Sequence, residues 1–247
     1  MRDGKTIQLF VSALLVTLWT TQAYAGIGSF DDISFWVGEG ANEAALVIEW
    51  GDDKGKGMVW GYRWDGEQTG EDMVEAIAAA DPSLYYMSKR GTQYGSNLAG
   101  FGYDIDQDGE LGVIGRVGLD FAGLVSKPDE SGFIDVVDAY TDSDMWEALD
   151  ADDHHASGWY TGYWSYWTSY ETNPFDGGEW NYSPLGMSSL ELENGGWQGW
   201  SYSNFSEVGS GQAPSDVISA PVLAVPEPAS ISLLGLGCVL VLCRRNK

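Results

Sequence analysis

The hydrophobic pattern of the chain is mostly that of short β-strands. Two apolar and aromatic runs, Ala45–Trp50 and Met58–Trp64, flank a cluster of Gly, Asp and Lys, which predicts a β-hairpin with a long turn. The last third is rich in aromatic residues interrupted by Gly and predicts closely paired strands. Four more short runs, separated by Gly- and Asp-rich turns, predict strands around 83–88, 97–103, 112–121 and 133–138.

One segment, at about 70–80, has the periodicity of a helix. Thr69 is placed to cap its start, with Asp72 three residues later, and Asp81-Pro82 is placed to end it. Its apolar face is formed by Met73, Ile77 and Ala80.

These elements predict an α+β fold, a mainly antiparallel β-sheet domain with one or two short helices. Residues 142–153 are expected to form either the second helix or a turn. We expect the domain to cover residues 26–209. The small residues and prolines of 210–224 predict a linker that follows it.

The N-terminus has the order of a secretory signal peptide. Basic residues precede an apolar run, which ends in the small-residue pattern of Ala23 and Ala25. We expect residues 1–25 to be removed, so that Gly26 begins a chain exported through the secretion translocon. The alternative is a buried N-terminal helix or strand.

Composition narrows the classes of function. Residues 26–225 contain 35 acidic and seven basic residues, a net charge of −28, which disfavours nucleic acid as a partner and attracts divalent cations. The aromatic share of 13% is unlike that of a disordered acidic chain. Both cysteines, Cys238 and Cys243, lie near the C-terminus, so the domain has no disulfide and its core depends on burial.

The C-terminus is a candidate membrane anchor. Residues 229–243 carry no charge and are followed by Arg244 and Arg245. As a helix they would span roughly 22 Å, which is short for a hydrocarbon core of about 30 Å but feasible with local thinning. The basic residues favour the cytoplasmic side, which leaves the acidic domain outside.

Immediately before this apolar run lie Pro226, Glu227 and Pro228. Together with the run and the arginines, they make residues 225–247 similar to the PEP-CTERM sorting signal of Gram-negative surface proteins. The resemblance implies recognition by an exosortase, a transpeptidase-like membrane enzyme, and cleavage near the Pro-Glu-Pro motif. The tail would then be a transient anchor in the cell envelope, before delivery to the cell surface or extracellular matrix. Proteins with this signal are typically linked to extracellular polysaccharide and biofilm.

The domain contains, in order, a hairpin, a helix and two aromatic strands, Trp164–Trp167 and Gly196–Tyr202. This order is similar to the C-terminal-like domain of transcobalamins, which has a Trp-x-Tyr-Trp/Tyr strand and a late strand ending in Trp-x-Tyr. The resemblance implies a small α+β module that accompanies cobalamin or cobalt uptake.

The segment "DIDQDGE" is a candidate calcium loop. Asp104, Asp106 and Asp108 alternate before a glycine, as in the first half of an EF-hand, and Glu110 follows with its backbone carbonyl. The twelfth position is Gly115 instead of the bidentate Glu, which excludes a complete EF-hand. The alternatives are a looser Ca²⁺ turn and an ordinary Asp/Gly-rich hairpin turn.

A second acidic segment, "DADDHH", contains the two histidines of the chain. Neighbouring side chains of a strand point to opposite faces, so His154 and His155 are not expected to bind one ion. Either one beside the carboxylates could ligate a metal or serve as the axial ligand of a corrin or haem. The alternative is a solvated turn before the aromatic strand.

The aromatic residues of segment 159–167, together with Trp197 and Trp200, are the strongest candidates for binding. Their rings cannot all face inward on alternating strands, so some are expected at the surface, where they suit stacking on sugar rings or a flat macrocycle. The alternative is that long loops cover them. The predicted ligand platform consists of Trp159, Trp164, Trp167, Trp197 and Trp200, with His154.

No catalytic motif of the nucleophile-elbow, phosphate-loop or His-Glu-x-x-His type occurs in the sequence. The leading hypothesis is therefore a non-enzymatic surface or matrix protein that binds polysaccharide or a small ligand, with Ca²⁺ as a stiffening ion. A secreted glycan hydrolase with two carboxylates is the first rival. A corrinoid-binding accessory protein is the second.

Overall fold

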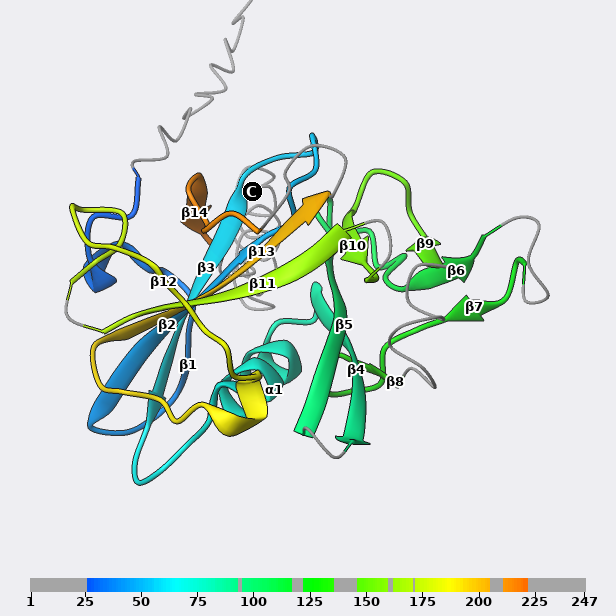
Figure 1. The fold of residues 1–247 in the computed structure, drawn as a ribbon. Helices are drawn as coiled ribbons and strands as arrows, with labels where there is room; N and C mark the ends of the chain where they lie inside the picture. The colour runs from blue at the N-terminus through cyan, green and yellow to red at the C-terminus, as the bar shows by residue number, and fades with distance from the viewer. Residues whose placement is uncertain are drawn as a thin grey trace, which may run out of the picture.

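The computed structural model describes residues 26–92, 95–116, 122–135, 146–159, 162–170, 172–204 and 211–221. Within these ranges the protein is mostly β-sheet with one α-helix, which confirms the predicted β-rich class (Figure 1). The predicted signal peptide, the Pro-Glu-Pro motif and the apolar run 229–243 all lie outside the described residues.

The largest sheet has seven strands of mixed direction. Its central strand β2 pairs antiparallel with β3 and parallel with β13, and its residues Ala44–Ile48 are buried on both faces. The continuous apolar run therefore forms an interior strand, as expected for a run without polar alternation. The order along the sheet is β1 (Trp36–Gly38), β3 (Gly57–Trp64), β2 (Asn42–Glu49), β13 (Gly196–Asn204), β11 (Gly162–Ser169) and β12 (Asn181–Tyr182), and β14 (Val217–Ser219) also pairs with β3.

Two smaller sheets and two 3-10 helices complete the described fold. The sheet of four strands has the order β10 (His154–Ser157), β5 (Gly95–Tyr103), β4 (Leu84–Thr92) and β8 (Phe133–Asp135). The sheet of three strands has the order β7 (Val125–Ser126), β6 (Val113–Gly115) and β9 (Trp146–Ala148). The 3-10 helices are η1 (Phe30–Asp32) and η3 (Met187–Ser189).

The α-helix α1 (Gly70–Ala80) confirms the helix predicted at about 70–80. Thr69 and Asp72 form a capping box, with Asp72 N–H donating to Thr69 Oγ1 over 3.3 Å and Thr69 N–H to Asp72 Oδ2 over 2.7 Å. Asp81 ends the helix, and its buried carboxylate accepts from the indole N–H of Trp60 at 2.8 Å. The buried face of α1 consists of Gly70, Met73, Val74, Ile77 and Ala78.

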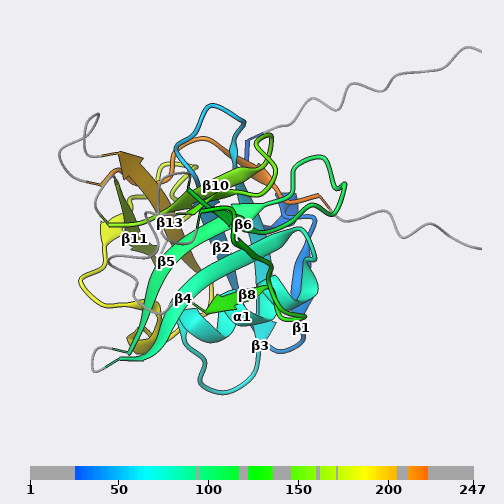
Figure 2. The same ribbon diagram turned by 90° about the vertical axis from the view of Figure 1, so that its right-hand side faces the viewer.

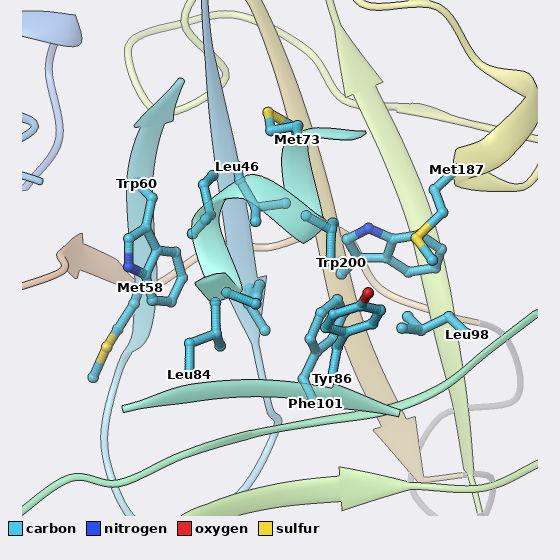
Figure 3. Close-up of a cluster of buried hydrophobic side chains, with 14 of the residues drawn as sticks. Leu46, Met58, Trp60, Met73, Leu84, Tyr86, Leu98, Phe101, Met187 and Trp200 are labelled. Carbon is cyan, nitrogen blue, oxygen red and sulfur yellow. The ribbon is translucent and has the colours of Figure 1, made fainter. Parts of the chain in front are cut away.

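The main core lies between the seven-stranded sheet, α1 and the four-stranded sheet. In Figure 2, β4 and β5 lie in front of β2 and β3. Figure 3 shows side chains from all three layers that converge there: Leu46, Trp60, Met73, Tyr86, Phe101 and Trp200. The alternate residues Ala45 and Val47 face a second, smaller core with Val59 and Trp197. The large sheet is thus covered on both faces, which accounts for its high content of buried apolar residues.

Two predicted segments differ from their expected structure. Within 142–153, the described residues Trp146–Ala148 form strand β9 instead of a helix, because they pair with β6; a turn follows at 149–152. The segment 210–224, expected as a linker, contributes β14 to the large sheet. Val217 and Ala220 are buried there, and Ala220 N–H donates to Val59 O at 2.9 Å.

Candidate functional site

Two regions carry the predicted site residues, and the first is a pair of acidic loops. One loop, Asp104–Glu110, follows β5, and the other, Asp150–Asp153, precedes β10. Because β5 and β10 are antiparallel neighbours with Tyr103 opposite His154, the end of one strand and the start of the other bring these loops together.

Hydrogen bonds to the backbone shape the acidic loops. The carboxylate of Asp104 accepts from Gln107 N–H at 2.6 Å and from Gly109 N–H at 3.0 Å. The carboxylate of Asp153 accepts from Ile105 N–H at 3.0 Å, which ties the second loop to the first. Gln107 has a φ of 60°, a left-handed conformation that closes the tight turn.

Six of the seven carboxylates of the acidic loops form two triplets. Within each triplet, oxygen atoms of the three residues lie within 4.8 Å of one another. Hard carboxylate oxygens at this spacing are the ligands that Ca²⁺ prefers. The triplets are Asp104, Asp106 and Asp153, and Asp108, Glu110 and Asp150.

The charge of the first triplet affects its own ionisation. Burial raises the pKa of Asp153 to about 6, and the neighbouring carboxylates of Asp104, Asp150 and Asp106 add to the rise. The N–H of Ile105 opposes it. A divalent cation would offset the repulsion between these neighbouring carboxylates, since it favours the ionised form of all three members of the triplet.

The sequence placed Asp104, Asp106, Asp108 and Glu110 in one candidate site, whereas the structure divides them between the two triplets. The third member of each triplet comes from "DADDHH", at least 40 residues later. Sequence analysis assigned the aspartates of that segment to a histidine site, because pairing of β5 with β10 is not visible in the local pattern.

The second region is a cleft of about 200 Å³ lined by aromatic side chains. We call it the aromatic cleft. It is built by the start of β5, by β11 and β13, and by the segment from β12 to η3. Its lining consists of Ser96, Asn97, Leu98, Trp159, Tyr163, Trp164, Tyr166, Tyr182, Ser183, Pro184, Leu185, Gly186, Met187 and Trp200.

The aromatic cleft has a buried floor and an exposed rim. On the floor, the rings of Tyr166 and Trp200 stack at 4.2 Å between centroids with an interplanar angle of 6°. At the rim, Tyr182 and Leu185 are 52% and 49% exposed. The hydroxyl of Tyr182 lies 3.0 Å from that of Tyr163, so the two phenols at the rim are hydrogen-bonded to each other.

Half of the predicted ligand platform lies in the aromatic cleft. Trp159, Trp164 and Trp200 line it, although Trp164 and Trp200 are nearly fully buried. Trp167 is not part of the lining, but its ring contacts Tyr182 edge-on at 5.5 Å. Trp197 is buried in the second core.

The two histidines point to opposite sides of β10, as predicted, but they do not lie in a solvated turn. His154 is 2% exposed, stacks on Trp50 at 4.5 Å, and has its Nδ1 2.9 Å from a carboxylate oxygen of Asp52. His155 Nδ1 instead lies 2.9 Å from the hydroxyl of Tyr85. His154 therefore does not belong to the described lining of the aromatic cleft.

Sequence analysis missed the cleft residues Tyr182, Ser183 and Leu185. They lie in "NYSPLG", where a Ser-Pro pair indicates a turn but gives no sign of a binding wall. They line the same cleft as Ser96–Leu98, a segment more than 80 residues earlier in the chain.

Comparison with known proteins bears on the C-terminus. A family model for the PEP-CTERM protein-sorting motif matches residues 224–247. The chain therefore carries this motif, as predicted, which marks an exported protein of the cell envelope that is recognised by an exosortase, a membrane enzyme.

No curated protein and no solved structure matches the chain. The resemblance of the domain to transcobalamins is thus not confirmed. Within the described ranges no helix has the length and apolarity needed to cross a membrane, and the predicted anchor 229–243 lies outside those ranges.

Proposed function

We propose that the exported domain is a non-enzymatic binding module that holds neutral polysaccharide in the aromatic cleft, at the cell surface or in the extracellular matrix. One observation carries this proposal. The domain has a net charge of −28 between residues 26 and 225, yet none of the described residues that line the cleft is charged. A neutral ligand is the class that such a lining suits.

The chemistry of the lining supports a sugar. The apolar faces of pyranose rings stack on aromatic planes, and their hydroxyls need a few placed polar groups. The rim offers the rings of Trp159, Tyr163 and Tyr182, and the walls offer the polar side chains of Asn97 and Ser183.

The rival functions have less support. A glycan hydrolase needs two carboxylates on either side of the scissile bond, about 5–10 Å apart, and no carboxylate belongs to the described lining of the aromatic cleft. A corrin-binding role for His154 would require its ring to leave Trp50 and Asp52, which hold it in the interior.

We also propose that the acidic loops bind Ca²⁺ and that the ion stiffens the edge of the four-stranded sheet. The specific observation is a triplet of carboxylates whose oxygens lie within 4.8 Å of one another; in this triplet, burial raises the pKa of Asp153 to about 6. This role is structural and separate from the aromatic cleft.

Calorimetric titration of the full-length chain, purified in detergent, with soluble β-glucan, mannan and galactan tests the cleft. We expect binding of at least one of them, and Tyr182→Ala and Trp159→Ala to weaken it about tenfold or more, the equivalent of about 1.4 kcal/mol. Leu124→Ala is the matched control, because Leu124 is 57% exposed and outside the cleft. The proposal fails if no neutral polysaccharide binds, or if the rim variants bind as well as the control.

A truncation after Val225 tests the sorting step by itself. We expect the truncated chain to lose normal delivery, since it lacks Pro226–Pro228 and the apolar run. Normal delivery at normal levels would contradict a sorting role for the tail.

A further inference from the structure

A second recess, of about 480 Å³, lies among strands of all three sheets. We call it the junction pocket. Its walls come from the loop after β2, from β9 and β10, and from the end of β13. Among the described residues, the aromatic cleft and the junction pocket share no lining residue, so they are two separate recesses.

Two of the seven basic residues of the domain line the junction pocket. The ammonium group of Lys54 donates to the backbone carbonyl of Asp153, a neutral partner that leaves its charge in place. Arg116 lies 3.2 Å from the carboxylate of Glu147, with both side chains exposed, at 44% and 59%. Such a surface ion pair is weak and its guanidinium is free to bind a ligand as well.

The two carboxylates in the described lining of the pocket each contact another side chain. Both oxygens of Asp52 lie within 3.0 Å of His154 Nδ1, and Glu147 contacts Arg116. The pocket thus holds two cations and two carboxylates, whereas carboxylates outnumber cations by 35 to seven in residues 26–225. It is therefore much richer in basic side chains than the domain as a whole.

Neutral groups and rings complete the junction pocket. His155 Nε2 lies 3.0 Å from the hydroxyl of Ser157, and both residues border the recess. Aromatic walls are supplied by Trp50, Trp146 and Tyr202. A ring-shaped ligand with one anionic group matches this combination of cations, hydroxyls and aromatic planes.

We propose that the junction pocket binds an acidic sugar residue, with its anionic group, carboxylate or phosphate, at Lys54 and Arg116 and its ring against the aromatic walls. This site is distinct from the proposed site for neutral polysaccharide. It would give the protein a second contact to matrix glycans that carry uronic acid or phosphate.

Calorimetry on the full-length chain in detergent, with D-glucuronate, D-glucose and glucose 1-phosphate as probes, tests the proposal. We expect D-glucuronate or glucose 1-phosphate to bind at least tenfold more tightly than D-glucose, and the preference to shrink as salt rises. Binding of glucuronate alone assigns the site to carboxylate, and equal binding of both anions assigns it to anionic charge in general.

Arg116→Gln and Lys54→Gln should each weaken binding of the anionic probe about three- to tenfold, and Lys127→Gln, which removes a charge outside the pocket, should not. Arg116 is exposed, so its variant is expected to fold even if Lys54→Gln disturbs the acidic loops; a thermal melt checks both. The proposal is overturned if glucose binds as tightly as the anions, or if Lys127→Gln has the same effect as Arg116→Gln. It is also overturned if Tyr182→Ala removes anion binding, which would move that binding to the aromatic cleft.

Discussion

The aromatic cleft and the acidic loops are built in opposite ways. The floor of the cleft is part of the main core, where Trp164, Tyr166 and Trp200 are 3–5% exposed. The acidic loops lie outside that core, and turn hydrogen bonds hold their carboxylates in two triplets. The cleft is therefore held by packing whether or not a ligand is bound, whereas the loops hold like charges together and gain from an added cation.

This difference separates two kinds of site. A site that shares its side chains with the core has a rigid shape, because interiors are close-packed and tolerate little change of volume. A site of clustered carboxylates is sensitive to pH and to ions, because its energy is mostly electrostatic.

Trp200→Ala should have the largest effect on stability. The ring of Trp200 stacks on Tyr166 and contacts Phe101, so its removal leaves a cavity in the main core. We expect the free energy of unfolding to fall by about 3–5 kcal/mol, as for large aromatic residues truncated in cores. Denaturant unfolding measures it. A fall below about 1 kcal/mol would show that the floor of the cleft is not part of the core.

Calcium should stabilise the domain through the acidic loops. At a free concentration 100 times its dissociation constant, Ca²⁺ is expected to raise the free energy of unfolding by about 2.7 kcal/mol. Asp106→Asn with Asp108→Asn removes one charge from each triplet but keeps an oxygen at each position. Thermal melts with and without Ca²⁺ should show the stabilisation lost in this variant and kept in Glu130→Gln. Equal Ca²⁺ effects in both variants would contradict the site.

The pH dependence of stability should report on Asp153. Its pKa is raised from 3.8 to about 6, which means that the folded protein holds this proton more tightly than the unfolded chain does. The free energy of unfolding is therefore higher below about pH 4 and falls as the pH rises through about 6. Without Ca²⁺ we expect a loss of roughly 1–2 kcal/mol over this window, less than the full shift implies because solvent screens the loops. Asp153→Asn should flatten this pH profile of stability. In the protein that retains Asp153, saturating Ca²⁺ should reverse the slope of the profile. An unchanged profile in Asp153→Asn would refute the assignment.

Tyr182→Ala should have the smallest effect on stability. Its ring is 52% exposed at the rim of the cleft, and we expect the free energy of unfolding to change by no more than about 0.5 kcal/mol. The same variant is expected to weaken polysaccharide binding about tenfold or more. Unfolding curves of Tyr182→Ala and Trp200→Ala therefore separate rim from floor, and a large effect of Tyr182→Ala would remove that distinction.

Local sequence patterns were sufficient to predict the elements that are formed by interactions between residues close together in the chain. The capping box of Thr69 and Asp72 and the stop at Asp81 fix the ends of α1, because each acts within one turn of the helix. The hairpin of β2 and β3 was predicted for the same reason, since its two apolar runs are separated only by a polar turn.

Other elements depended on partners far along the chain. The strand β14 looked like a linker because it is short and flanked by proline and small residues, and only its pairing with β3, about 160 residues earlier, makes it a strand. Trp146–Ala148 likewise became a strand through β6. Tertiary pairing overrides local propensity in such short segments.

Contiguous segments and composition were enough to recognise the PEP-CTERM motif of residues 224–247, the many aromatic rings and the large excess of carboxylates. The three-dimensional fold was needed to distinguish the rings that line a cleft from those that fill the core, and to show which aspartates from two separate loops meet. The physical reason is range: sorting motifs are read as contiguous segments, whereas strand order, which sets burial and the distances between charges, arises from contacts among distant parts of the chain.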